Sequence, residues 1–301
     1  TALLGFGLAM LGFFIIGSLV GVLFAIPFVE GGVNGLLEFA ANPTSKQSYQ
    51  LPLLIMQGVA SFTGLIIIPL IYLKARERNL KLSPQTSEWI VYILTLGAVI
   101  MFMGVNSIII DRNSSVSFPQ FMKGFEEWAR QNEDSLAEAT GLITNFDSFW
   151  MFLLGFVVIE IIPAIGEELV FRGLLQRKLI EATLNPHLAI WISAALFSAI
   201  HIQFFGFFPR MLLGALFGYL YYWTGDLKVA IFAHFVNNAF TLVMVYLNQL
   251  GWVDFDLENT ESPALYSVIL FAIITSTILY IIHKKSTNTA LNESMADRFQ
   301  D

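Results

Sequence analysis

Residues 149–171 read FWMFLLGFVVIEIIPAIGEELVF, an apolar stretch interrupted by three carboxylates, Glu160, Glu167 and Glu168. A helix of about 20 apolar residues is long enough to cross the hydrocarbon core of a bilayer. Ionisable groups at membrane depth are costly, and they usually mark a functional site. This stretch therefore predicts both a membrane-spanning helix and the position of the protein's chemistry.

The whole chain has the composition of a polytopic membrane protein. Of its 301 residues, 56% are hydrophobic and 13% are charged, and the mean hydropathy is +0.67. A soluble domain is about 45–50% apolar and about 25% charged. The net charge of -7 argues against a nucleic-acid partner. Because the chain has no cysteine, it offers no disulfide, thiolate nucleophile or sulfur ligand for a metal.

Eight apolar segments are candidates to cross the bilayer, so the sequence predicts an all-α bundle of about eight transmembrane helices. The first segment lacks a basic region in front of it and is longer than the apolar part of a signal peptide, which favours a retained span. The eight segments are residues 2–28, 51–73, 89–110, 149–171, 187–205, 208–224, 228–248 and 263–283.

Basic and acidic connections alternate between the two sides of the predicted bundle. The connection 74–88 and the end of the fourth span are basic, whereas residues 111–148 and 249–262 are acidic. Because basic loops stay in the cytoplasm, this pattern predicts that both termini are cytoplasmic. The charges used are Lys74, Arg76, Arg78, Lys81, Arg172, Arg177 and Lys178 on the basic side, and Asp254, Asp256, Glu258 and Glu261 in the last acidic connection.

An amphipathic pattern lies between the third and fourth spans. Its apolar residues recur at helical spacing opposite a charged face, which predicts a short helix on the outer membrane interface. We expect this helix to be a lid or a packing element. The apolar face is Phe118, Phe121, Met122, Phe125, Trp128 and Ala129, and the charged face is Lys123, Glu126, Glu127 and Arg130.

Polar residues in consecutive spans predict one shared site. Glu168 and Arg172 are four residues apart, so they share a helix face and form an ion pair, which leaves Glu167 available to another helix. Glu167 and His201 are each 17 residues from residue 184, the centre of a predicted hairpin. At about 1.5 Å per residue, their side chains should meet at one depth.

His234 and Asn238 extend this site from the seventh span, again at a spacing of four residues. We expect the groups to converge on a wet cavity in the cytoplasmic half of the membrane. Glu167 with His201 can then activate a water, while His234 and Asn238 donate hydrogen bonds to an oxyanion. In an alternative, Glu167, His201 and His234 bind a divalent metal such as Zn²⁺. The sequence favours the metal-free reading.

The order EExxxR, FxxxH, HxxxN resembles the CPBP family of intramembrane proteases, which includes type II CAAX prenyl proteases and bacteriocin-processing or bacteriocin-immunity proteins. The resemblance covers about residues 149–250. It implies that Glu167 and His201 activate water, that His234 and Asn238 stabilise the oxyanion, and that Glu168 and Arg172 organise the first motif. The matching residues are Glu167, Glu168, Arg172, Phe197, His201, His234 and Asn238.

This resemblance implies an endopeptidase whose substrate is a peptide or protein in the lipid bilayer, either prenylated or a peptide precursor. It divides the chain into N-terminal spans with the outer helix (1–148), a catalytic core (149–250), and a last span with a polar tail (251–301). The compact chain favours a bacterial inner membrane. A non-enzymatic immunity or scaffold protein and a proton-coupled transporter are the alternatives, and the oligomeric state stays open.

Three further polar residues lie outside these motifs. We expect Glu160 to serve helix packing or to face the outer interface, and Arg210 to extend to the outer interface. Such a placement keeps a long side chain's charge in water. Asn237 lies beside Asn238, so the sequence leaves open which of the two amides faces the site.

Overall fold

The computed structural model describes residues 2–76, 82–255 and 263–298, with side chains for 4–76, 82–255 and 263–286. Every regular element in these ranges is a helix, so the predicted all-α class is confirmed. Part of the predicted charge alternation lies outside the described residues, namely Arg78, Lys81, Asp256, Glu258 and Glu261.

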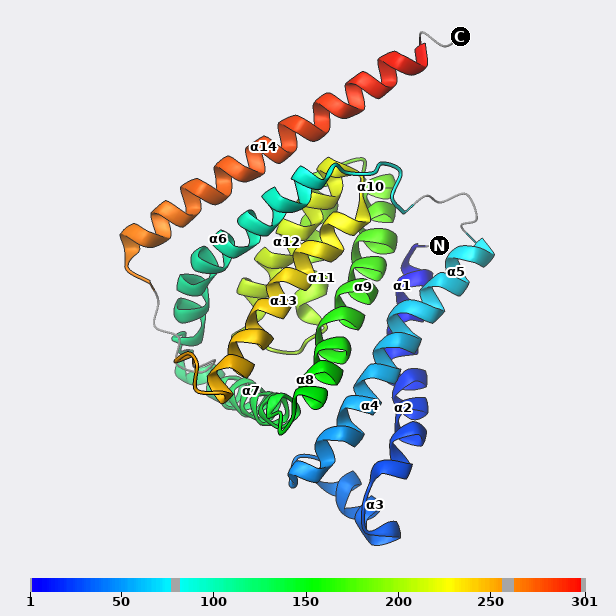
Figure 1. Cartoon of the computed structure of the whole chain (residues 1–301), viewed down its shortest axis with the longest axis vertical. Helices are drawn as coiled ribbons and strands as arrows, with labels where there is room; N and C mark the ends of the chain where they lie inside the picture. Colours follow the sequence, from blue (N-terminus) through cyan, green and yellow to red (C-terminus); the bar gives the residue numbers. More distant parts are fainter. Residues whose placement is uncertain (1, 77–81, 256–262, 299–301) are drawn as a thin grey trace.

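Six helical segments among the described residues are long and apolar enough to cross a membrane, two fewer than predicted. The predicted all-α membrane bundle is thereby confirmed (Figure 1). The segments are Leu4–Phe28, with α1 (Ala2–Leu11) and α2 (Ser18–Ala25); Gln47–Arg76, with α4 (Gln50–Ser61) and α5 (Ile68–Arg76); α6 (Trp89–Ser114); Phe149–Thr183, with α8 (Phe149–Gly155), α9 (Ile162–Glu168) and α10 (Arg177–Thr183); α13 (Leu227–Gln249); and Leu265–Ser286 of α14 (Leu265–Arg298).

The other two predicted spans form a shorter packed pair, α11 (Pro186–Ala199) and α12 (Phe207–Thr224). The 14 residues of α11 reach only about 21 Å, less than the roughly 30 Å of a hydrocarbon core. The prediction that this helix continues to residue 205 is therefore wrong. The chain instead reverses direction through residues 200–206, and this turn carries His201.

The long helix that carries the first motif widens twice into a π-helix, at Phe156–Ile161 and at Leu169–Gln176. Such segments are rare, and they occur frequently at functional sites. The first ends just before Pro163, which has no backbone N–H to donate to the preceding turn. The second contains Arg172, so the first motif lies where the backbone departs from regular α geometry.

A close approach of small residues brings this helix against the N-terminal pair of helices. A Cβ atom on Gly166 would lie 2.6 Å from the Leu65 Cβ, in the π-helical segment Phe62–Ile67 that joins α4 to α5. Only glycine permits this spacing, because real Cβ contacts are longer. The packing fixes the helix one residue before Glu167.

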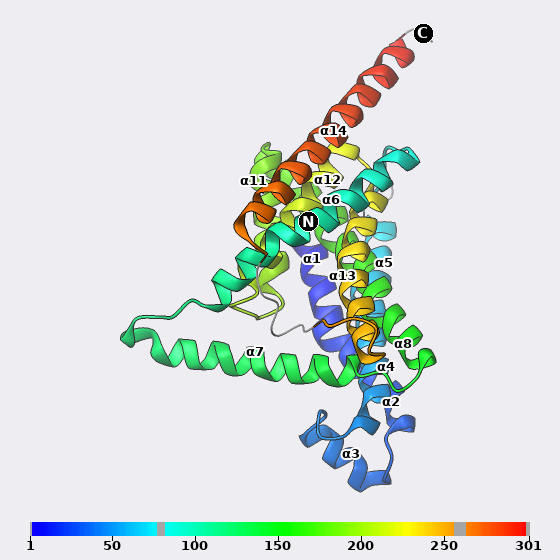
Figure 2. The ribbon, with the colours of Figure 1, turned by 60° about the vertical axis from the view of Figure 1, so that its left-hand side comes forward.

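The predicted amphipathic helix is α7 (Lys123–Thr144), which crosses one end of the bundle (Figure 2). It begins later and runs farther than predicted, with α3 (Gly32–Ala41) at the same end. Glu126 is buried, which corrects its placement on the solvent face. Its carboxylate accepts hydrogen bonds from the Phe118 backbone N–H at 3.1 Å and from Arg130 Nε at 3.1 Å.

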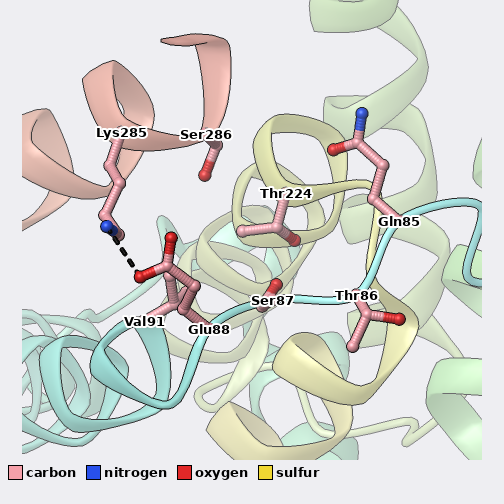
Figure 3. Close-up of a pocket in the computed structure, with 8 residues that line it drawn as sticks. All are labelled: Gln85, Thr86, Ser87, Glu88, Val91, Thr224, Lys285 and Ser286. Carbon is pink, nitrogen blue, oxygen red and sulfur yellow. Dashed lines mark ion pairs between the residues drawn. The ribbon is translucent and has the colours of Figure 1, made fainter. Parts of the chain in front are cut away.

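The C-terminal end of α5 and the start of α10, which carry described basic residues, lie at the opposite end of the bundle from α7 (Figure 1). At that end Asp226 is fully buried and accepts hydrogen bonds from the Ser87 backbone N–H and the Tyr92 hydroxyl. Figure 3 shows Lys285 of α14 facing Glu88, with 2.9 Å between Nζ and Oε2. These contacts tie the connection before α6 to α13 and α14.

Candidate active site

The predicted ion pair of the first motif is present and fully buried. Arg172 Nη1 donates to Glu168 Oε1 at 2.8 Å, and both side chains are at most 1% exposed. Arg172 Nη2 also donates to the Gly214 carbonyl of α12 at 2.7 Å. A buried ion pair needs such additional hydrogen bonds, because removing two charges from water costs several kcal/mol per ion.

His234 joins this pair from α13. Its Nδ1 lies 2.8 Å from Glu168 Oε1, so Glu168 contacts both the guanidinium and the imidazole. The imidazole stacks on Phe217 at 5.1 Å between ring centroids, and the Arg172 guanidinium lies 4.7 Å from the centre of the Phe197 ring. Because Phe217 stacks on the His234 ring, Phe197 meets it edge-on and Glu168 holds Nδ1, the ring has a fixed orientation that presents Nε2.

Glu167 has a different environment from Glu168 beside it. Its side chain is 15% exposed and lines a cavity, whereas the Glu168 side chain is fully buried. Glu167 Oε2 lies 4.0 Å from His234 Nε2, and no described residue donates a hydrogen bond to its carboxylate. The two adjacent carboxylates thus face different surroundings, as their helix positions predicted.

His201 lies in the turn after α11 and also lines the cavity. Its Nδ1 is 2.8 Å from the Phe197 carbonyl oxygen. Because a carbonyl can only accept, Nδ1 carries the hydrogen and Nε2 retains its lone pair. Ile202 next to it has a φ of +55°, which is strained for a β-branched residue, and Asn132 of α7 donates to its carbonyl.

The structure places Glu167 and His201 on the wall of one cavity, with no direct hydrogen bond between them among the described residues. The imidazole in charge-pair range of Glu167 is His234, a contact that the sequence did not predict. The prediction that Glu167 and His201 meet used only their equal distances along two helices from the turn at residue 184. It does not locate the third helix, α13, that packs against α9.

Asn237 and Asn238 both line the cavity, so neither amide is excluded from it. Asn237 Nδ2 donates to Asn238 Oδ1 at 3.0 Å. Asn238 therefore keeps its own Nδ2 as a donor for a group in the cavity. This arrangement gives the two amides different tasks.

The cavity has a volume of about 890 Å³ and runs from the level of Glu167 toward α7. Its described wall includes α7 residues and none of the basic connection 82–88. The turn at 200–206 lies against α7 instead of continuing α11. The lining α7 residues are Leu136, Ala139, Thr140 and Ile143.

Arg210 lies elsewhere than predicted, whereas Glu160 lies in helix packing, one of its two predicted places. Arg210 does not extend to the outer interface: it is partly buried in the first turn of α12 and lines the cavity. The segment PheGlyPhePhePro before it is the turn signal that could have indicated this position. Glu160 is buried at 3% exposure and does not line the cavity, so it belongs to helix packing rather than to the outer interface.

The alternative to metal-free catalysis is a divalent metal held by Glu167, His201 and His234. Among the described residues, no group of three histidine, cysteine or acidic side chains is placed to hold an ion. His234 commits Nδ1 to Glu168, and His201 commits Nδ1 to a carbonyl, but each Nε2 remains open. The predicted set of Glu167, His201 and His234 would have to draw closer to bind Zn²⁺.

Helices of membrane length around a cavity lined by both polar and apolar side chains define an integral membrane protein with a site enclosed by its helices. Residues 149–240 match the family model described as type II CAAX prenyl endopeptidase Rce1-like. The resemblance to the CPBP family of intramembrane proteases is thereby confirmed over the segment that carries all three motifs. The mechanism and the substrate are separate questions.

A protein of Bacillus subtilis (strain 168), described as uncharacterized protein YpbD, is 30% identical over 87 residues. The match covers 28% of this chain and 41% of that relative, so the chain spans about two fifths of the relative's length. No solved structure matched the chain.

Proposed function

We propose that this protein is an intramembrane endopeptidase that hydrolyses a peptide bond of a membrane-associated or lipidated substrate. The observation that carries the proposal is the shared cavity, in which Glu167, His201, His234 and Asn238 all line one space. The match to the Rce1-like family model supports a peptidase. The wall combines a free carboxylate with open donors and acceptors, as acyl hydrolysis requires.

Glu167 and His201 activate the attacking water in this proposal. His201 Nε2 has a lone pair, and the Glu167 carboxylate has no protein donor among the described residues. A water between them loses a proton to Glu167 as its oxygen attacks the carbonyl carbon. The C–N bond then breaks, and the proton held by Glu167 passes to the leaving amine.

His234 and Asn238 stabilise the charge that develops on the carbonyl oxygen. Glu168 accepts the hydrogen on Nδ1, so His234 donates from Nε2 into the cavity as the doubly protonated imidazolium, and Asn238 keeps Nδ2 as a donor. Fixed donors of this kind contribute about 2.7–4 kcal/mol each to transition-state stabilisation. Glu168 and Arg172 act through His234 and do not line the cavity.

The test is cleavage of a peptide with a prenylated cysteine followed by three apolar residues, by protein purified in detergent. Glu167→Ala and His201→Ala should abolish cleavage while the thermal midpoint and membrane insertion persist. Full turnover by either purified variant would overturn the assigned roles. The immunity or scaffold function is favoured instead by two results together: the wild type does not cleave the peptide, and the alanine variants keep a protective or partner-binding phenotype in cells.

We propose that catalysis needs no metal. Removing divalent ions with a chelator should leave the cleavage rate unchanged, because Glu167 and His201 already supply a base and an acceptor for water. Metal analysis of the purified protein accompanies the assay. Activity that the chelator removes, and that Zn²⁺ alone restores, contradicts this mechanism and favours Glu167, His201 and His234 as ligands.

We also propose a bacterial inner-membrane location with both termini in the cytoplasm, which the basic residues near α5 and α10 support. The chain has no cysteine, so single introduced cysteines report their side without background. A membrane-impermeant thiol reagent should label Glu127→Cys on α7 in intact cells and Glu181→Cys in α10 only after lysis. The opposite labelling pattern would reverse the orientation.

A further inference from the structure

Arg210 is a cation on the cavity wall that the water-activating and oxyanion-stabilising roles do not use. It lies in the first turn of α12, where Gly206 is the N-cap. The partial positive charge of a helix N-terminus makes this an unfavourable place for a guanidinium. An anion beside it would be stabilised by both charges.

The hydrogen bonds of Arg210 are incomplete. Nη2 donates to the side-chain oxygen of Gln203, whereas Nη1 is buried and has no hydrogen-bond partner in the described part of the chain. No carboxylate of a described residue forms an ion pair with Arg210. A buried donor without a partner and a partly buried cation without an anion are each costly.

The nearest carboxylates do not complete this site. Glu133 of α7 accepts hydrogen bonds from the backbone N–H groups of Phe205 and Gly206 at 2.8 and 3.3 Å, so it holds the turn. Glu167 acts on Arg210 at longer range, without an ion pair. Gly206 has no side chain, and a Cβ there would lie 3.3 Å from Arg210 Nη1. The guanidinium thus has room over the start of α12.

We propose that Arg210 binds a carboxylate group of the peptide substrate and so positions the scissile bond in the cavity. The inference rests on the proposed peptidase function. Two N–H groups of a guanidinium match the two oxygens of a carboxylate, and such charge-assisted pairs are strong. Gln203 orients the guanidinium from one side, which leaves the Nη1 side for the substrate.

The rest of the wall favours a peptide over a lipid phosphate at this position. Five amide side chains line the cavity together with Arg210: Gln57, Asn106, Gln203, Asn237 and Asn238. Amides pair with the N–H and C=O groups of a peptide backbone, whereas two acyl chains of a phospholipid would leave them unpaired. The carboxylate comes from the substrate's C-terminus or from an acidic side chain, and the experiment distinguishes these sources.

The test measures binding of three prenylated peptides of one sequence: one with a free C-terminal carboxylate, one with a C-terminal amide, and one amide with an internal glutamate near the C-terminus. Glu167→Gln protein in nanodiscs of neutral lipid prevents turnover, and fluorescence anisotropy reports the dissociation constant. The carboxylate form should bind about 10- to 100-fold more tightly than the plain amide, since hydrogen bonds between charged groups contribute about 1.5–3 kcal/mol. Tight binding of only the internal-glutamate peptide identifies a side chain as the source.

Arg210→Met should remove this discrimination, and Arg210→Lys should retain part of it because the charge remains. Arg112→Met is the matched control, because Arg112 is exposed in α6 and does not line the cavity. Thermal midpoints of all variants report folding.

Equal binding of all three peptides by protein with Arg210 intact overturns the inference. Discrimination that persists in folded Arg210→Met overturns it as well. Binding that instead follows the fraction of anionic lipid assigns Arg210 to a headgroup and also overturns it. Cleavage by the wild type is measured separately, so loss of the proposed peptidase function and loss of carboxylate recognition give different results.

In turnover experiments the same contact predicts a specific kinetic pattern. Arg210→Met should raise KM for the carboxylate peptide and leave the amide peptide unaffected, because uniform binding is removed. If Arg210 instead serves Glu167, kcat falls equally for both peptides. That result would overturn the substrate-binding role.

Discussion

The site contains two polar groups of residues that lie side by side and differ in almost every physical respect. The buried cluster of Glu168, Arg172 and His234 is joined by bonds of 2.8 Å and enclosed by Phe197 and Phe217. The second group, called the cavity group here, lines the cavity, and its side chains form few hydrogen bonds with other described residues. Its members are Glu167, His201, Asn238 and Arg210.

The difference separates positioning, by Glu168 and Arg172, from chemistry in the cavity, and His234 belongs to both because it also lines the cavity. A carboxylate that already accepts from Arg172 and contacts His234 has little capacity to take a proton from water. A carboxylate without donors is free to act as a base. Adjacent residues Glu167 and Glu168 thus differ in role because the helix directs one to the cavity and the other to the core.

Removing one member of the buried cluster should have the largest effect on stability. Arg172→Met should lower the free energy of unfolding by about 3–5 kcal/mol, because it leaves the Glu168 charge buried without its cation. Activity should fall as well, since His234 loses its fixed partner. Unfolding in mixed detergent micelles measures the change.

The control is Glu167→Gln, one residue from the buried cluster. It should keep the wild-type unfolding free energy within about 0.5 kcal/mol, as substitutions away from buried networks do, while cleavage is lost. The double variant Glu168→Met/Arg172→Met sharpens the result, because apolar pairs often replace buried ion pairs at little cost. Equal losses of unfolding free energy in Glu167→Gln and Arg172→Met would contradict the distinction between the buried cluster and the cavity group.

A second prediction separates the two adjacent amides of α13. Asn238→Ala should lower kcat by about 10²–10³-fold, the effect of removing one oxyanion donor. Asn237→Ala should have a smaller effect, because Asn237 donates to Asn238 Oδ1 and acts through it. Steady-state kinetics on one peptide compare the two purified variants. A larger loss in Asn237→Ala would exchange their roles.

Local patterns predicted the buried ion pair, and longer-range packing decided the rest. Glu168 and Arg172 are four residues apart on one helix, so spacing alone brings them together. The contact of His234 with Glu168 spans 66 positions and depends on how α13 packs on α9. No periodicity within one segment contains that information.

The same limit explains the errors at the α7 end. Apolar runs predicted two spans at 187–205 and 208–224. Hydropathy does not show that residues 200–206 are an apolar turn and not the last part of the first helix. That turn moved His201 and Arg210 toward α7. Glu126 was assigned to the solvent face because the helical pattern was counted from Phe118, which precedes the helix.

The smallest expected effect concerns Glu126, a carboxylate outside the spans. The backbone N–H of Phe118 donates to it and lowers its pKa below the usual value, and Arg130 and Lys123 add to the effect. Because the folded pKa is depressed, its contribution to stability is present above the unfolded pKa of about 4.3. It is lost as the pH falls through the folded value.

Hydrogen exchange over residues 116–126 measures this contribution. Glu126→Gln should increase exchange there at pH 7, and the wild type should approach the variant as the pH falls below about 4. Exchange around Glu168 should stay unchanged, because the buried cluster does not depend on this carboxylate. The exposed Glu127→Gln, one position along α7, is the matched control. If Glu127→Gln increased exchange over residues 116–126 as much as Glu126→Gln does, the number of negative charges on α7, and not the hydrogen bond from Phe118, would stabilise the start of this helix.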